Sequence, residues 1–85
     1  MQQILQSKPT DMFTVQVFEE STGKPAYYKK VGVAFKGFFR GVTKDIYTDR
    51  NGEAHFDYDN GEGTIYVQGQ KVYEGEIRGR KIIYI

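Results

Sequence analysis

The one histidine of the chain, His55, is the side chain best suited to acid–base chemistry near neutral pH. Residues two apart in a strand share a face, so His55 and Asp57 are expected to lie together on an outer face and could form a hydrogen-bonded pair. Nucleophilic catalysis needs a nucleophile beside a base that a third group orients. With one histidine and no cysteine, we expect no catalytic residues and predict that the protein is not an enzyme.

A second polar segment, Asp57 to Glu62, places several oxygen-bearing side chains close together in sequence. Ca²⁺ prefers oxygen ligands that converge from one loop, but this segment lacks the distal bidentate glutamate of an EF-hand. Asp59-Asn60-Gly61 is an ordinary turn sequence. We therefore expect a turn here, and predict neither a metal site nor a cofactor site.

Aromatic and basic residues are interleaved between Tyr27 and Arg40. Such a strand can stack nucleic-acid bases and neutralise phosphates. The net charge of +1, however, gives little attraction to a polyanion, so nucleic acid is not the partner that we expect. Single-stranded nucleic-acid binding is kept as an alternative, with contacts from Lys29, Lys30, Lys36, Phe38, Phe39 and Arg40.

Four tyrosines, Tyr27, Tyr28, Tyr47 and Tyr66, are expected to have partly exposed rings. Tyrosine is common at interfaces because it buries a large area at a low cost in side-chain entropy. We therefore predict a non-catalytic interaction or structural module that docks on a protein partner, or on itself, through an edge strand. The expected partner-binding residues are Tyr27, Tyr28, Lys30, Lys36, Phe38, Phe39, Arg40 and Ile83.

The elements that would position these residues are short strands separated by turns. Apolar residues alternate with polar ones, which predicts strands with one buried face. No segment has a sustained helical period. The pattern predicts an all-β fold, a seven-stranded antiparallel β-sandwich. The expected inward-facing residues are Phe13, Val15, Val17, Val31, Val33, Phe35, Ala54, Phe56, Tyr58, Ile65, Val67, Tyr73 and Ile77.

The last expected strand, residues 80–85, is apolar on both faces, with Ile82 and Tyr84 on one face and Ile83 and Ile85 on the other. Such a strand is usually buried on both faces or pairs with another subunit. We therefore expect Ile83 to belong to a self-interface.

The strongest turn signal is Asp49-Arg50-Asn51-Gly52. Asn-Gly favours a type I′ turn, in which both central residues have positive φ, so we predict a hairpin from Tyr47 to Tyr58. Asp49 is expected to accept hydrogen bonds from the backbone amides ahead of it.

The segment from Thr48 to Phe56 resembles the hairpin of transthyretin-like (prealbumin-like) β-sandwich domains, and in style that of carboxypeptidase regulatory-like domains. Val15–Phe18 with Ser21–Ala26, and Thr64–Gly69, resemble further pieces of that family in the expected order. The resemblance implies a transthyretin- or immunoglobulin-like Greek-key sandwich. It also implies carbohydrate binding as another alternative, because related sandwiches have sugar sites with exposed aromatic residues.

Relatives that hydrolyse 5-hydroxyisourate use several His and Arg residues and a Tyr-Arg-Gly-Ser tail. This chain has one histidine and ends in Ile82-Ile83-Tyr84-Ile85, so the resemblance implies no such activity.

A length of 85 residues predicts one domain: a flexible arm over residues 1–11 and the sandwich over residues 12–85. Without cysteine there is no disulfide framework. No apolar run is long enough to span a membrane, and no signal peptide is evident, so we expect a cytoplasmic protein unless a signal has been removed. Basic residues dominate from Lys24 to Lys44 and acidic ones from Asp45 to Glu62, which predicts pairing across neighbouring strands.

Overall fold

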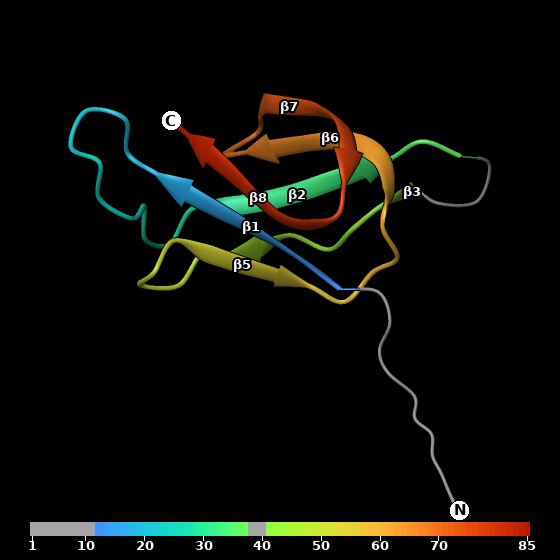
Figure 1. The fold of residues 1–85 in the computed structure, drawn as a ribbon, viewed down its shortest axis with the longest axis horizontal. Coiled ribbons are helices and arrows are strands. Elements are labelled where there is room, and N and C mark those ends of the chain that lie inside the picture. Colours follow the sequence, from blue (N-terminus) through green and yellow to red (C-terminus); the bar gives the residue numbers. More distant parts are fainter. Residues whose placement is uncertain (1–11, 38–40) are drawn as a thin grey trace, which may run out of the picture.

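The computed structural model describes residues 12–37 and 41–85, which contain eight strands and no helix (Figure 1). The expected all-β class is thus confirmed for this part of the chain, in which no helix could cross a membrane. The expected arm, residues 1–11, lies outside the described residues. The strands are β1 Phe13–Phe18, β2 Lys30–Phe35, β3 Gly41–Val42, β4 Ile46–Tyr47, β5 Glu53–Phe56, β6 Gly61–Val67, β7 Gln70–Ile77 and β8 Gly79–Tyr84.

The strands form two sheets. Sheet A has the order β5–β1–β8, and sheet B has the order β3–β2–β6–β7, with β4 also pairing with β2. In Figure 1, sheet A lies in front of sheet B. Every pairing is antiparallel except β1–β8, which is parallel. The expectation of a wholly antiparallel fold is therefore wrong at β8, because the chain crosses from sheet B to sheet A at Arg78 and then runs beside β1 in the same direction.

The described residues contain one strand more than the seven expected, because residues 41–47 form two short strands, β3 and β4, instead of one. Thr43 causes the division. Its backbone amide donates to the Val33 carbonyl (2.8 Å), and its hydroxyl accepts from the Val33 amide (3.0 Å). The Thr43 side chain thus replaces one backbone partner of β2, and regular pairing with β2 resumes only at Ile46.

The turn over residues 49–52 differs from the predicted type I′ turn. Its Gly52 amide donates to the Asp49 carbonyl (2.9 Å), and of its four residues only Gly52 has positive φ, at 78°. This is the geometry of a type I turn followed by a left-handed glycine. As expected, Asp49 accepts hydrogen bonds ahead of it: its Oδ1 is 2.9 Å from both the Asn51 and Glu53 amides, which favours the right-handed turn.

The predicted hairpin around this turn is also different. The Asp49 amide donates to the Glu53 carbonyl (2.9 Å), so the turn closes, but the flanking strands then separate. Strand β4 pairs with β2 in sheet B, whereas β5 pairs with β1 in sheet A. The turn is therefore a crossover between the sheets.

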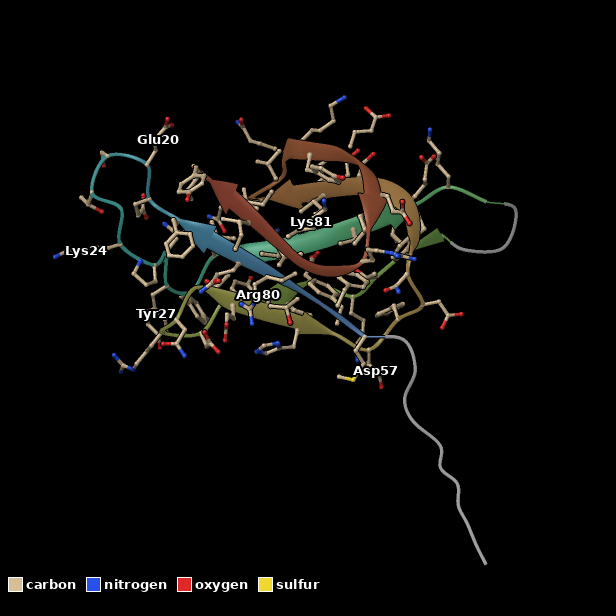
Figure 2. The ribbon with its side chains drawn as sticks, viewed as in Figure 1. Glu20, Lys24, Tyr27, Asp57, Arg80 and Lys81 are labelled. Carbon is tan, nitrogen blue, oxygen red and sulfur yellow. The ribbon has the colours of Figure 1, made fainter. Side chains whose placement is uncertain are left out.

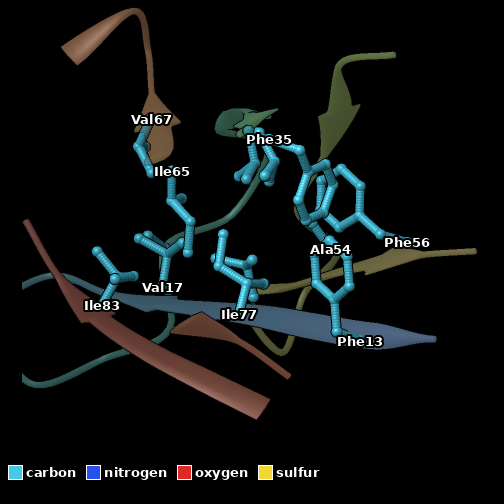
Figure 3. Close-up of a cluster of buried hydrophobic side chains, with 13 residues drawn as sticks. Phe13, Val17, Phe35, Ala54, Phe56, Ile65, Val67, Ile77 and Ile83 are labelled. Carbon is cyan, nitrogen blue, oxygen red and sulfur yellow. The ribbon is translucent and has the colours of Figure 1, made fainter. Parts of the chain in front are cut away.

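The two sheets share one hydrophobic core (Figure 3). Alternate residues of β1, β2, β5 and β6 point into it, as the period of two predicts, and Phe13 stacks on Phe56 with ring centroids 5.1 Å apart. Tyr58 and Tyr73 pack at its margin. The buried residues are Phe13, Val15, Val17, Ala26, Val31, Val33, Phe35, Ala54, Phe56, Ile65, Val67, Ile77 and Ile83.

Candidate functional site

Three exposed tyrosines gather where the segment before β2 meets β4. The exposed fractions of Tyr27, Tyr28 and Tyr47 are 53%, 64% and 47%, in agreement with the expectation of partly exposed rings. Tyr28 stacks on Tyr47 with ring centroids 4.6 Å apart, and Tyr27 lies 6.0 Å from Tyr28. We call these three residues the tyrosine platform. Figure 2 shows Tyr27 beside the turn that joins β4 to β5.

Thr48, which is buried with 2% of its surface exposed, holds this platform in place. Its hydroxyl donates to the Ala26 carbonyl (2.7 Å) and accepts from the Lys29 amide (2.8 Å). Its backbone carbonyl accepts from the Tyr28 amide (3.0 Å), and its backbone amide donates to the Lys29 carbonyl (2.9 Å). One threonine therefore ties the chain on both sides of Tyr27 and Tyr28 to the end of β4.

Tyr28 has a left-handed backbone, with φ of 59°. This conformation is unfavourable for a residue with a Cβ atom and costs on the order of 1 kcal/mol. The hydrogen bonds from Thr48 oppose this cost, so the ring is held outward by the surrounding structure rather than by local preference.

A positive charge lies on the platform. The guanidinium of Arg50 is 5.1 Å from the centroid of the Tyr27 ring, within the range of a cation–π contact. Lys30, one of the expected partner-binding residues, lies directly opposite Tyr47 in the β2–β4 ladder and is half-buried. The platform therefore combines aromatic surface with basic groups at its edge.

Two other expected partner-binding residues, Lys36 and Ile83, lie away from the platform. Lys36 follows the opposite end of β2 from Lys30 and forms an ion pair with Glu62 (3.9 Å), a pairing between the basic and acidic segments as expected. Phe38, Phe39 and Arg40 lie outside the described residues.

Ile83 is 6% exposed and belongs to the core, which differs from the expectation of an interface residue. Its register explains this position. Ile83 lies directly opposite Val17 in the β1–β8 pair, so both side chains share the inner face. Ile82 and Tyr84 occupy the outer face and are exposed.

A second candidate site is formed by three residues of the turn and β5, which we call the histidine cluster: Asp49, Glu53 and His55. Nε2 of His55 lies 3.5 Å from Glu53 Oε1 and 4.0 Å from Asp49 Oδ2. His55 does not form the hydrogen-bonded pair with Asp57 that the sequence allowed, and Figure 2 shows Asp57 at the far end of β5 from the turn. Instead, its Nδ1 is 2.8 Å from the Thr14 hydroxyl on β1.

Contacts around the histidine cluster fix its two carboxylates. Arg80 Nη1 donates to Glu53 Oε2 (2.6 Å) and to the side-chain oxygen of Gln16 (3.0 Å), and Figure 2 shows Arg80 on the outer side of sheet A. The pKa of Asp49 is lowered, chiefly by the hydrogen bond from the Glu53 amide and, to a smaller degree, by that from Asn51 and by the nearby His55.

Together with Thr14, the histidine cluster contains the three kinds of group found in a catalytic triad. These are the hydroxyl of Thr14, the imidazole of His55 and the carboxylate of Glu53. Thr14, however, lies in the middle strand of sheet A, whose backbone pairs with β5 on one side and β8 on the other. The amides beside the hydroxyl are thus committed to the ladders and cannot form an oxyanion hole. The backbone beside Thr14 therefore supplies no oxyanion hole.

Sequence reasoning missed both Thr48 and the histidine cluster. A Glu-x-His spacing within β5 was a signal for part of the cluster, because Glu53 and His55 must share a face of a strand. Asp49 joins the cluster through the type I turn that the structure contains, and the predicted turn was of type I′.

Comparison with known proteins finds no matching family model, no matching curated protein and no matching solved structure.

Proposed function

We propose that this protein is a non-catalytic interaction module that docks on a protein partner through the tyrosine platform. The observation that carries the proposal is the group of three exposed tyrosines held in a fixed arrangement by a buried threonine. Large rings that are already ordered lose little entropy on binding.

The strained backbone of Tyr28 supports this proposal. Strain of this kind tends to persist where function requires a side chain in one position. A glycine at this position would relieve the strain, so the tyrosine lowers the stability of the fold, and a function of its ring would explain why a tyrosine is present. Binding through the ring is such a use.

The β-sandwich of Greek-key, transthyretin-like topology belongs to the same proposal. Its support is the pair of mostly antiparallel sheets around one core, together with the motifs from Thr48 to Phe56. In such a sandwich the platform lies at one end, where loops rather than strand edges make contact with a partner.

The experiment is a quantitative capture from lysate with two matched variants, followed by titration of each captured protein in purified form. The platform variant is Tyr28→Gly, which removes the ring while keeping the backbone conformation. The control is Tyr66→Ala, which removes an exposed tyrosine from the outer face of β6.

The expected result is a partner that binds the wild type and Tyr66→Ala equally, and binds Tyr28→Gly at least about tenfold more weakly, as for the loss of an interface hot spot. Circular dichroism and urea unfolding should show that Tyr28→Gly is folded. Equal capture by all three proteins would contradict the proposal.

Three alternatives have tests of their own. Retention of a glycan by the wild type but not by Tyr28→Gly would assign the platform to carbohydrate binding. A salt-dependent shift with a single-stranded oligonucleotide would favour nucleic-acid binding through Lys30 and its neighbours. Self-association through the exposed edge of β8 would appear as a dimer in light scattering that Ile82→Lys dissociates.

A further inference from the structure

We propose that the histidine cluster, Asp49, Glu53 and His55, is a binding site for a divalent transition-metal ion of the Zn²⁺ class. One ligand atom from each residue lies within 4.8 Å of the others. Ligands about 2.1 Å from a tetrahedral Zn²⁺ lie roughly 3.4 Å from one another, close to the 3.5 Å and 4.0 Å that separate His55 Nε2 from the two carboxylates. The proposal does not depend on the tyrosine platform.

These separations do not suit direct hydrogen bonds. A hydrogen bond from a ring nitrogen to a carboxylate oxygen is about 2.7–3.2 Å long. His55 Nε2 is farther than this from both Glu53 and Asp49, although each of the three groups faces the others. Both distances are longer than a hydrogen bond. They are within the range of an ion pair when His55 is protonated, and they are close to the spacing of ligands around a cation.

Hydrogen bonds within the described part of the chain occupy one polar side-chain atom of each residue and leave the other for a cation. Two turn amides occupy Asp49 Oδ1, and Arg80 occupies Glu53 Oε2. The Thr14 hydroxyl occupies His55 Nδ1, which fixes the ring orientation. Such outer contacts orient metal ligands and typically raise affinity. The remaining carboxylate oxygens, Asp49 Oδ2 and Glu53 Oε1, are the ones that lie 4.0 Å and 3.5 Å from Nε2.

The donor set indicates the class of metal. One imidazole nitrogen and two carboxylate oxygens suit Zn²⁺ and its first-row neighbours, whereas Ca²⁺ and Mg²⁺ prefer six or more oxygen ligands. Arg80 reduces the negative charge of Glu53, and the cluster is partly exposed to solvent, so we expect micromolar rather than tighter binding. Three protein ligands leave a position for water or for a side chain of a partner.

The test is titration of the untagged full chain, freed of metal by a chelator, with ZnCl₂, followed by calorimetry and by NMR of the His55 ring. We expect saturable one-to-one binding and a shift of the Nε2 resonance that marks coordination. His55→Gln should weaken binding at least tenfold, and Thr14→Val should weaken it by about tenfold through loss of ring orientation. Asp57→Asn, which removes a negative charge outside the cluster and no ligand, should change affinity by less than twofold.

Three outcomes would overturn the proposal. One is the absence of saturable binding at millimolar Zn²⁺. Another is equal affinity of the wild type and His55→Gln, which would mean adventitious binding to surface carboxylates. The third is an affinity for Ca²⁺ equal to that for Zn²⁺, because a site defined by imidazole must prefer the transition metal. Circular dichroism should confirm the fold of each variant, which is expected because His55 is exposed.

Discussion

Replacing Thr48 with valine tests the role of its buried hydroxyl most directly. Valine keeps the shape of the side chain and its preference for extended backbone, but it can neither donate to the Ala26 carbonyl nor accept from the Lys29 amide. The backbone hydrogen bonds of residue 48 remain possible. The variant therefore removes only the two side-chain contacts that hold the segment carrying Tyr27 and Tyr28.

The size of the expected loss in stability follows from the burial of the two groups that lose a hydrogen bond, the Ala26 carbonyl and the Lys29 amide. A buried polar group left without a partner costs about 1–3 kcal/mol. Ala26 is only 1% exposed and should incur most of that cost, whereas Lys29 is partly exposed and water can replace its lost acceptor. We expect the free energy of unfolding to fall by about 2–3 kcal/mol, out of a total of roughly 4–13 kcal/mol for a chain of this length.

Urea unfolding followed by circular dichroism measures this change. With a slope of about 1–1.5 kcal/mol per molar urea, the midpoint should fall by roughly 1.5–3 M. Hydrogen exchange at the Lys29 amide should also accelerate in Thr48→Val. The control is Thr64→Val, because the hydroxyl of this half-buried strand residue makes no hydrogen bond within the described residues, and the expected loss is below about 0.5 kcal/mol. A loss below 0.5 kcal/mol for Thr48→Val, or equal losses for both variants, would refute the reasoning.

Three further predictions, which use four substitutions, have defined outcomes. Ile83→Lys places a charge in the core and should leave the protein unfolded, with no cooperative transition in thermal denaturation. Ile82→Lys, on the exposed face, should change the free energy of unfolding by less than about 1 kcal/mol. Similar melting of the two variants would contradict the register of β8. Gly52→Ala should cost about 1–3 kcal/mol in urea unfolding, because φ is positive and the new Cβ would meet the Val17 carbonyl, and an unchanged midpoint would argue against this close approach. The pKa of Asp49 is lowered in the folded state, so its carboxylate contributes stability that is fully present above the ordinary value of 3.8 and is lost as the pH falls through the lower folded-state value. Asp49→Asn should therefore weaken the dependence of the free energy of unfolding on pH in that acidic range. Identical acid titrations of the wild type and the variant would show that the carboxylate makes no such contribution.

The burial of individual residues was predictable where a strand alternates clearly. Val31 and Val33 point into the core because their neighbours on the other face, Gly32 and Ala34, offer no competing apolar surface. Residues 82–85 are all apolar, so alternation could not choose between the two faces there. Pairing with β1 made that choice, and it is a long-range contact that no local pattern contains.

Sheet membership was not predictable for the same reason. Strong turn residues around Asn51 indicated a reversal of the chain, and the reversal exists, but a turn does not specify whether its flanking strands pair with each other. The exposure of Tyr27 and Tyr28 was predicted from residue type, whereas their fixed arrangement depends on Thr48, whose side chain reaches a segment some distance back along the chain. Only the folded structure brings these groups together.

The parallel pairing of β1 with β8 has a consequence for synthesis of the protein. Of the described strands, β1 is made first, whereas one of its two neighbours in sheet A, β8, is made last. Until then, one edge of β1 offers unpaired amides and carbonyls that can join other chains. Completion of sheet A must therefore wait until β8 has been made. It depends on a contact between segments far apart in sequence, and such contacts slow folding. A nascent chain stalled before Gly79 would present that open edge for as long as the stall lasts, which makes loss of the last strand a route to aggregation rather than a simple loss of stability.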